Sequence, residues 1–209
     1  MAENQLKSEG AIPIIKSSVR LESLNLAKNE LSEEVGASIS NLLTLSATMQ
    51  KLHLEFNALD VAGTRQLAVG LSRSPSLRYL NLKGNKICDA GMSLLATSML
   101  SCPTLTELDV SLNEIGHAGF ESLCSVLPQT NLQTLVCCKN LLSDEILLLF
   151  AQTIEGPDYT GDTQLRRFDL SSCHLTDQGL LFLISALANN SNISQIRLAD
   201  NFFSESIEA

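Results

Sequence analysis

The sequence has no tryptophan, and aromatic residues make up only 4% of its 209 residues. It also lacks an apolar run of the roughly 20 residues that a membrane-spanning helix needs. The longest apolar stretch is 180–188, which the buried face of a helix explains. Residues 1–10 are polar and hold no apolar core of a secretory signal. These absences predict a chain that makes no membrane contact and is located in the cytoplasm.

Positive charge is also scarce in this sequence. Fourteen Lys and Arg stand against 23 Asp and Glu, which gives a net charge of −9. Such a surface repels polyphosphates, so we expect no nucleic acid and no anionic membrane as a partner. A neutral or basic protein is the expected partner. The hydrophobic fraction of 44%, dominated by leucine, is enough for a sizeable aliphatic core.

What the sequence does have is an internal repeat. Its phrase has leucine-type residues at positions 1, 4, 6 and 11 and asparagine at position 9. The best copies are LESLNLAKNEL, LRYLNLKGNKI and LTELDVSLNEI. Successive copies are separated by 28, 28, 28, 27, 33 and 28 residues. The copies begin at Leu21, Met49, Leu77, Leu105, Leu132, Leu165 and Ile193.

The two halves of each repeat have different apolar spacings. In the first half apolar residues stand two apart, as at Leu80 and Leu82, which predicts a short strand. In the second half they stand four apart, as at Leu95 and Met99, which predicts a helix face. In four repeats a glycine falls where the chain enters this helix, where a side chain would crowd a neighbour. These are Gly63, Gly91, Gly119 and Gly179.

Asparagines recur at one phase of the repeat and predict a stacked ladder. An amide side chain both donates and accepts hydrogen bonds, so a column of them can satisfy backbone groups where each strand bends toward its helix. Cys173 takes this place in the sixth repeat, where a thiol is a weaker partner and we expect local loosening or a water. The expected ladder consists of Asn29, Asn57, Asn85, Asn113, Asn140 and Asn201.

A period of about 28 residues with this signature resembles the ribonuclease inhibitor class of leucine-rich repeat proteins, from Leu21 to Ile207. The resemblance implies an α/β fold, a right-handed horseshoe-shaped solenoid of about seven repeats. Its parallel strands would line the concave face and its helices the convex face. Known members bind proteins within cells, and some regulate small GTPases. We expect 1–20 to form a partial N-terminal cap and 21–209 the repeat domain, with the last repeat incomplete.

Three segments depart from the repeat. The insert at 155–164 is interpreted as a surface loop, with Tyr159 as an interaction tip in a second interpretation. At the N-terminus, Pro13 is expected to forbid a long helix. At the C-terminus the seventh strand has no following helix before Ala209. The chain is therefore a fragment of a longer protein, or its last strand is blunted by the final residues or associates with a partner.

Cysteine and histidine do not form a chemical motif here. The six cysteines occupy different positions within the repeat, no CxxC pair exists, and the three histidines do not share a site. Ser111 and Asp109 are neighbours, but no histidine joins them. We therefore predict no enzyme activity, no metal and no cofactor. Cys138 alone should point outward on the strand side and is the thiol to watch for reactivity.

The residues between the strand leucines should line the concave face, since side chains alternate along a strand. Tyr79 is the one aromatic residue in these columns, and with Lys51 and Glu107 it should form a continuous patch that has the makeup of a binding hot spot. The predicted protein-binding residues are Lys51, His53, Glu55, Phe56, Tyr79, Asn81, Lys83, Glu107 and Asp109.

Three functions remain open from the sequence. The first is a noncatalytic scaffold that binds a protein on its concave face. The second is a regulator of a small GTPase, for which the arginines Arg65, Arg78, Arg166 and Arg167 are available, although no acidic tail accompanies them. The third is the recognition segment of a larger multidomain protein. A GTPase-stimulation assay separates the second from the others.

Overall fold

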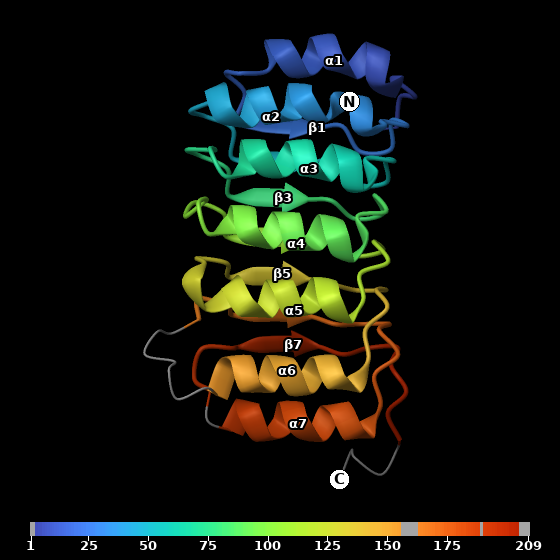
Figure 1. Ribbon diagram of the computed structural model, residues 1–209, viewed down its shortest axis with the longest axis vertical. Helices are drawn as coiled ribbons and strands as arrows, with labels where there is room; N and C mark the ends of the chain where they lie inside the picture. The colour runs from blue at the N-terminus through green and yellow to red at the C-terminus, as the bar shows by residue number, and fades with distance from the viewer. Residues whose placement is uncertain (1–2, 156–162, 189, 205–209) are drawn as a thin grey trace.

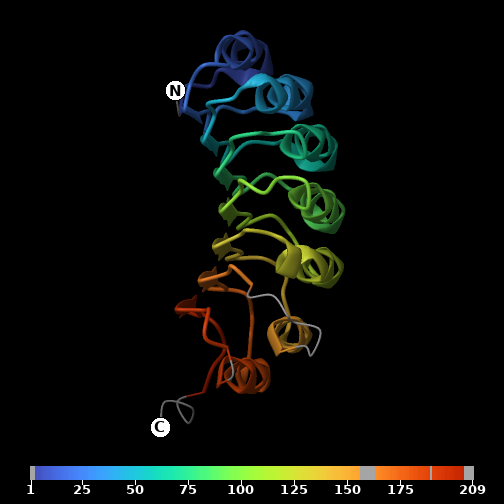
Figure 2. The ribbon, with the colours of Figure 1, turned by 90° about the vertical axis from the view of Figure 1, so that its left-hand side faces the viewer.

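The computed structural model describes residues 3–155, 163–188 and 190–204, and shows one curved stack of strands and helices. The helices follow one another from the N-terminal to the C-terminal end (Figure 1). Figure 2 shows the strands along the inner side of the curve and the helices along its outer side. The concave and convex faces are therefore occupied as the repeat pattern predicts.

Among the described residues, seven strands form one parallel sheet in sequence order, and each is three residues long. A strand this short fits the repeat, in which only the alternating segment is extended. The strands are β1 Ser23–Asn25, β2 Lys51–His53, β3 Tyr79–Asn81, β4 Glu107–Asp109, β5 Thr134–Val136, β6 Arg167–Asp169 and β7 Gln195–Arg197.

Seven α-helices and two short 3-10 helices are formed by the described residues. The α-helices are α1 Lys7–Ser17, α2 Gly36–Leu45, α3 Asp60–Leu71, α4 Cys88–Met99, α5 His117–Val126, α6 Asp144–Glu155 and α7 Asp177–Ala188. The 3-10 helices are η1 Glu33–Val35 and η2 Leu127–Gln129. Helices α2 to α7 each follow a strand, and α1 precedes the first.

The core lies between the sheet and the helices and runs the length of the stack. The strand leucines and the helix residues spaced by four meet there, and Leu80, Leu82 and Leu95 have no exposed surface. Cys137 is buried at a core leucine position, as predicted. Each repeat thus covers the apolar surface of the next, which is why the units need one another for stability.

The N-terminal cap differs from the sequence prediction in one respect. Pro13 lies inside α1, so the expectation that it forbids a helix of this length is wrong. Proline inside a helix loses its own N–H hydrogen bond and its ring crowds the carbonyl oxygen four residues earlier, and the burial of Ala11 and Ile15 against the first repeat offsets this cost. The helix therefore covers the open end of the core.

The asparagine ladder is present and is built from backbone contacts between neighbouring repeats. The Asn113 Oδ1 atom accepts hydrogen bonds from the backbone N–H groups of Asn85 at 2.8 Å and Ile87 at 3.3 Å. Its Nδ2 atom donates to the carbonyl oxygens of Leu82 at 2.9 Å and Ser111 at 3.0 Å. Each amide thereby joins two successive turns, which explains its fixed phase.

Cys173 substitutes for half of this pattern. Its Sγ atom lies 3.4 Å from the Cys137 carbonyl oxygen and 3.5 Å from the Ser171 carbonyl oxygen, and its single S–H can donate to one of them at a time. The backbone N–H of Cys173 itself still donates to Asn201 Oδ1 at 2.9 Å. The thiol therefore replaces the donor role of asparagine, while a sulfur is a poor substitute for its carbonyl acceptor.

The C-terminal end of the core is less covered than the middle. Ile196 and Leu198 are partly buried, whereas their counterparts Leu80 and Leu82 have no exposed surface. Phe202 forms an isolated bridge to Thr176 and is 65% exposed. Among the described residues no helix follows β7. Tyr159 and most of the predicted insert lie outside the described residues.

Gly70 lies where α3 approaches the backbone of α2 closely, and the repeat pattern does not single it out. A Cβ atom there would lie 2.5 Å from Ser40 Cα and 2.8 Å from Ser40 O, so the backbone of α2 would have to move. The four helix-entry glycines predicted from the repeat are also crowded, as expected. A Cβ atom on Gly63 would lie 3.0 Å from Glu33 Cα.

We expect Gly70→Ala to lower the free energy of unfolding by about 1–3 kcal/mol, because overpacking at backbone exceeds the gain in helix propensity. Urea denaturation followed by circular dichroism measures this change. Gly10→Ala is the matched control, since its Cβ would meet only Leu6 side-chain carbons, the nearer at 3.7 Å. Equal stability of the two variants would contradict close packing of α2 against α3.

Candidate binding surface

The sheet register brings the predicted concave residues into columns. Lys51 pairs with Tyr79 and Tyr79 with Glu107 along the first column. His53 pairs with Asn81 and Asn81 with Asp109 along the second. Neighbouring strands in a sheet lie roughly 4.8 Å apart, so these side chains are close neighbours. The structure therefore brings together residues that stand 28 positions apart in the sequence.

Tyr79 lies at the centre of this group and is held on two sides. The Asn81 Nδ2 atom donates a hydrogen bond to the Tyr79 hydroxyl oxygen at 3.2 Å. The His53 ring lies 4.8 Å from the Tyr79 ring between centroids, at an interplanar angle of 41°. Tyr79 is half-buried. Its ring is thus fixed before any partner arrives, which reduces the entropy cost of binding.

Three carboxylates surround this tyrosine. Burial raises the pKa of Tyr79 and the Asn81 hydrogen bond opposes that rise, while the negative charges of Glu55, Asp109 and Glu107 raise it further. The Tyr79 hydroxyl therefore stays protonated at neutral pH and can donate a hydrogen bond. The arrangement combines an aromatic ring, one donor and nearby negative charge.

Glu55 and His53 form the edge of the group toward the N-terminus. The His53 Nδ1 and Glu55 Oε1 atoms are 3.8 Å apart. The Glu55 Oε2 atom is buried and has no hydrogen-bond partner among the described residues. A buried carboxylate oxygen without a donor is costly, and a donor from a bound partner would relieve that cost.

The remaining predicted residues have three different environments. Lys51 and Glu107 are exposed, as a contact residue requires. Asn81 is only 8% exposed, so it positions Tyr79 more than it offers a surface of its own. Phe56 is 43% exposed, and the Lys83 Nζ atom lies 5.6 Å from its ring centroid. We call the nine predicted residues together the central patch.

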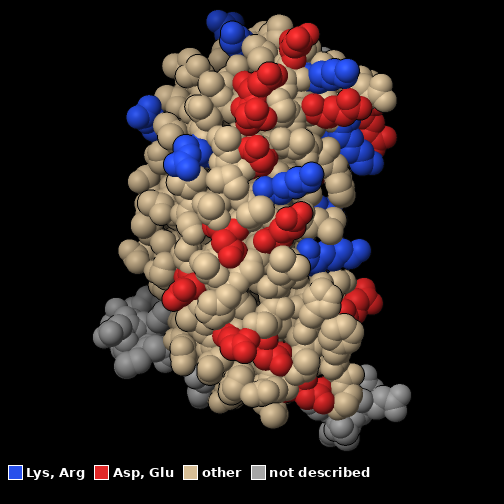
Figure 3. Space-filling view, turned by 45° about the vertical axis from the view of Figure 1, so that its right-hand side comes forward, with Lys and Arg blue, Asp and Glu red and all other residues tan. Residues whose placement is uncertain are grey.

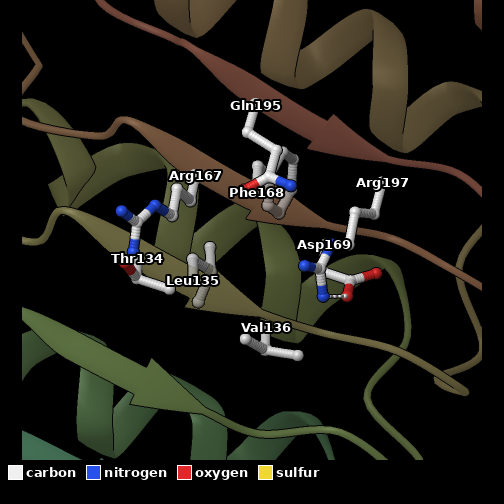
Figure 4. A pocket seen from close by; sticks show the side chains of 8 residues that line it. All are labelled: Thr134, Leu135, Val136, Arg167, Phe168, Asp169, Gln195 and Arg197. Carbon is white, nitrogen blue, oxygen red and sulfur yellow. Dashed lines mark ion pairs between the residues drawn. The ribbon is translucent and has the colours of Figure 1, made fainter.

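Apart from the central patch, a hollow lies on the concave face nearer the C-terminus, over β5, β6 and β7 (Figure 4). It encloses about 200 Å³ and is lined by Thr134, Leu135, Val136, Arg167, Phe168, Asp169, Gln195 and Arg197. Several of these residues lie in the concave columns that strand alternation predicts, but only Arg167 carries a predicted role, in the regulation of a small GTPase. The available signal was Val136, an apolar residue in a column that is otherwise polar.

Burial raises the pKa of the thiols. Burial first, together with the nearby Asp169, raises the pKa of Cys138 to about 12, so this thiol is protonated at neutral pH. The raised pKa gives no support to the expectation that Cys138 is reactive. Burial likewise raises the pKa of Cys124 to about 12. In the part of the chain that the structure describes, no group of three or more His, Cys, Asp or Glu residues could hold a metal ion.

The described residues contain no helix that is both long enough and apolar enough to cross a membrane. They form a repeat solenoid with one continuous strand surface and a hydrophobic interior. Such a fold is generally a non-enzymatic interaction scaffold. The fold by itself therefore places the chain in the class of repeat solenoids.

Comparison with known families gives the same class. Residues 73–96, 101–124 and 162–183 match a Leucine Rich repeat model, and residues 20–42 match a second Leucine Rich Repeat model. These four segments are similar to leucine-rich repeats, and the fold of the chain is a leucine-rich repeat solenoid. Among curated proteins, none matches its sequence.

Three solved structures are similar to this chain at low sequence identity. The ectodomain of the Arabidopsis receptor kinase HAESA, in complex with an IDA peptide hormone, is 22% identical with a TM-score of 0.46 over 90% of this chain. An internalin from Listeria monocytogenes is 18% identical with a TM-score of 0.44 over 91%. The TLR13–ssRNA13 complex is 18% identical with a TM-score of 0.47 over 94%.

The chain spans 27%, 58% and 35% of the lengths of these three solved chains, respectively. One of the three is a complex with RNA, so the comparisons give no support to the expected exclusion of nucleic acid.

Proposed function

We propose that this chain is a noncatalytic scaffold that binds a protein partner on its concave face, centred on the central patch. The observation that carries the proposal is the fixed Tyr79 ring, held by Asn81 and His53 on the inner surface of the curve. A rigid, partly exposed tyrosine has the properties of an interface hot spot. The surface around it is contributed by consecutive strands, so a partner can contact several repeats at once.

The charges around Tyr79 indicate the chemistry of the partner. Glu55, Glu107 and Asp109 lie near its hydroxyl, and Glu55 contributes a buried oxygen without a described donor. A basic side chain of the partner would meet these carboxylates and satisfy that oxygen. We therefore propose a basic segment of a protein as the group that the central patch recognises.

The proposal includes the ribonuclease inhibitor-like subclass and a cytoplasmic location. Most repeats are spaced by 27 or 28 residues, and each of the first six strands is followed by an α-helix, which supports the ribonuclease inhibitor-like class. All six cysteines are free thiols, which supports a reducing compartment such as the cytoplasm.

The test is affinity capture from native lysate with the full chain, followed by binding measurements on the recovered partner. We expect Tyr79→Ala to weaken that binding at least about tenfold, since truncation of a hot-spot residue costs about 2 kcal/mol or more. Glu107→Lys should further weaken the binding of a basic partner, because the substitution reverses the charge that the partner would contact.

Matched controls separate the concave face from general effects of charge. Glu121 is exposed on α5, on the convex side, so Glu121→Lys makes the same charge change away from the central patch. Tyr79→Phe keeps the ring and removes the hydroxyl. Unchanged affinity in Tyr79→Ala and Glu107→Lys, or an equal loss in Glu121→Lys, would rule out the central patch as the binding centre.

A further inference from the structure

The C-terminal half of the chain contains very few cations. Residues 101–209 hold 14 Asp and Glu and only four Lys and Arg, namely Lys139, Arg166, Arg167 and Arg197. On the face that Figure 3 shows, Lys and Arg are absent from the lower, C-terminal part, where only Asp and Glu stand out. Two of the four cations nevertheless line the same concave hollow. That coincidence sets the hollow apart from the rest of this half.

The sheet register explains how the two arginines come together. Arg167 begins β6 and Arg197 ends β7, and these strands pair directly, Arg167 with Gln195 and Asp169 with Arg197. Figure 4 shows the Arg167 guanidinium on the Thr134 side of the hollow and the Arg197 guanidinium on the Asp169 side. The Gln195 amide lies between them. Donors from three side chains therefore surround one opening.

The charge of this group is positive overall. The Arg197 Nη1 and Asp169 Oδ2 atoms are 3.8 Å apart, and the Arg197 side chain is 64% exposed, so this ion pair is weak and open to exchange. Burial tends to raise the pKa of Asp169, but hydrogen bonds from Ser171 and Cys138 and the charge of Arg197 together lower it. Asp169 is therefore ionised at neutral pH.

Arg167 completes the charge of the hollow. It is exposed and, among the described residues, has no carboxylate within 4.0 Å. Two guanidinium groups and one carboxylate leave one net positive charge. The acidic surroundings oppose an incoming anion only weakly at physiological salt, because charges beyond roughly 8 Å are screened.

The floor of the hollow is apolar. Val136 is partly exposed there, in a column whose other members are Asn25, His53, Asn81, Asp109, Asp169 and Arg197. Leu135 and Phe168 lie beneath it. An apolar floor with cationic edges suits a carboxylate attached to a short apolar group better than a fully hydrated anion.

We propose that this hollow binds a carboxylate of an extended peptide segment, with Arg167 as its principal partner and Gln195 and Arg197 as further donors. The inference rests on the proposed function in that the carboxylate belongs to a protein partner. Strand β4, with Glu107 and Asp109, lies two strands from β6, which is about 10 Å at the usual strand spacing. A peptide with a basic residue about three positions from a carboxylate would reach both sites.

The test uses three peptide probes on the full chain: acetyl-Ala-Ala-Val with a free C-terminus, the same peptide as its C-terminal amide, and acetyl-Ala-Asp-Ala amide. The readout is the NMR shift of the Arg167 and Arg197 Nε–H signals. We expect saturable shifts with the free-terminus probe, with the aspartate probe, or with both, and none with the uncharged amide. The first result assigns a terminal carboxylate and the second a side-chain carboxylate.

Variants locate the binding. Arg167→Gln removes the charge and should weaken the binding of the responding probe at least about tenfold, as expected for loss of a charge-assisted contact. Arg65→Gln on α3 is the matched control and should leave the probe unaffected. No shift with either acid probe, an equal shift with the uncharged amide, or tighter binding of inorganic phosphate than of both acid probes would overturn the proposal.

The experiment also separates this site from the central patch. Tyr79 lies on β3, three strands from β6, so Tyr79→Ala should keep the probe response. If neither acid probe binds while Tyr79→Ala still abolishes binding of the captured partner, only the proposal of the carboxylate site is wrong. If the probes bind at Arg167 while Tyr79→Ala keeps its partner, the carboxylate site stands and the central patch is wrong.

Discussion

Asn113→Ala is expected to lower the free energy of unfolding by about 3–5 kcal/mol, because each buried backbone group left without a partner costs about 1–3 kcal/mol. The variant removes the acceptor of two buried N–H groups, those of Asn85 and Ile87. It also removes one donor from each of the Leu82 and Ser111 carbonyl oxygens, which keep Asn85 Nδ2 and the Gly84 N–H as donors. These groups belong to two adjacent repeats, so the loss should weaken the joint between them. Chemical denaturation followed by circular dichroism measures the change.

Asn131→Ala is the control for this variant. Asn131 is exposed, and its described hydrogen bond is a single donation to the Pro103 carbonyl oxygen at 2.8 Å. We expect its loss to cost no more than about 1 kcal/mol. A similar effect for Asn113→Ala and Asn131→Ala would show that the ladder contributes little to stability.

Phe168→Ala is expected to lower the free energy of unfolding by about 3–5 kcal/mol, because truncation of a buried aromatic residue leaves a cavity. Phe168 stands at a core leucine position of the sixth repeat and is 1% exposed. Its ring centroid lies 4.5 Å from that of Phe150 and 6.1 Å from that of Phe120. The three rings join the fourth, fifth and sixth repeats through one aromatic cluster.

Thermal or chemical denaturation of Phe168→Ala measures this loss, and Phe202→Ala is the control. Phe202 is 65% exposed, so its truncation should change stability by no more than about 0.5 kcal/mol. Phe168→Leu restores the residue type typical of the repeat and should recover part of the stability. If Phe168→Ala unfolds at the same denaturant concentration as Phe202→Ala, the aromatic cluster is not part of the stabilising core.

The two proposals give the concave face a polarity along its length. The central patch presents carboxylates around Tyr79, and the hollow over β5 to β7 presents Arg167 and Arg197. A partner segment with charges of opposite order would therefore bind in one direction only. Polarity of this kind determines specificity more than it adds affinity.

The repeat, the strand positions and the asparagine ladder could be predicted from the sequence because each depends only on the spacing of residues. Leucines two apart and asparagines at one phase recur often enough for the period to be read directly. Reasoning from single residues was less successful. Pro13 does not prevent α1, because tertiary burial outweighs local propensity. Cys138 faces the strand side as expected, but burial and a neighbouring carboxylate raise its pKa.

The sequence by itself determined the solenoid, because a 28-residue period allows only a stack in which each unit covers the next. It also determined which residues share a concave column, since strand alternation and register follow from that period. Only the tertiary structure decided how exposed each column member is and what it touches. The burial of Asn81 beneath Tyr79, the approach of Gly70 to Ser40 and the approach of the Arg197 guanidinium to Asp169 depend on the distance between repeats. That distance is set by packing, which no single repeat encodes.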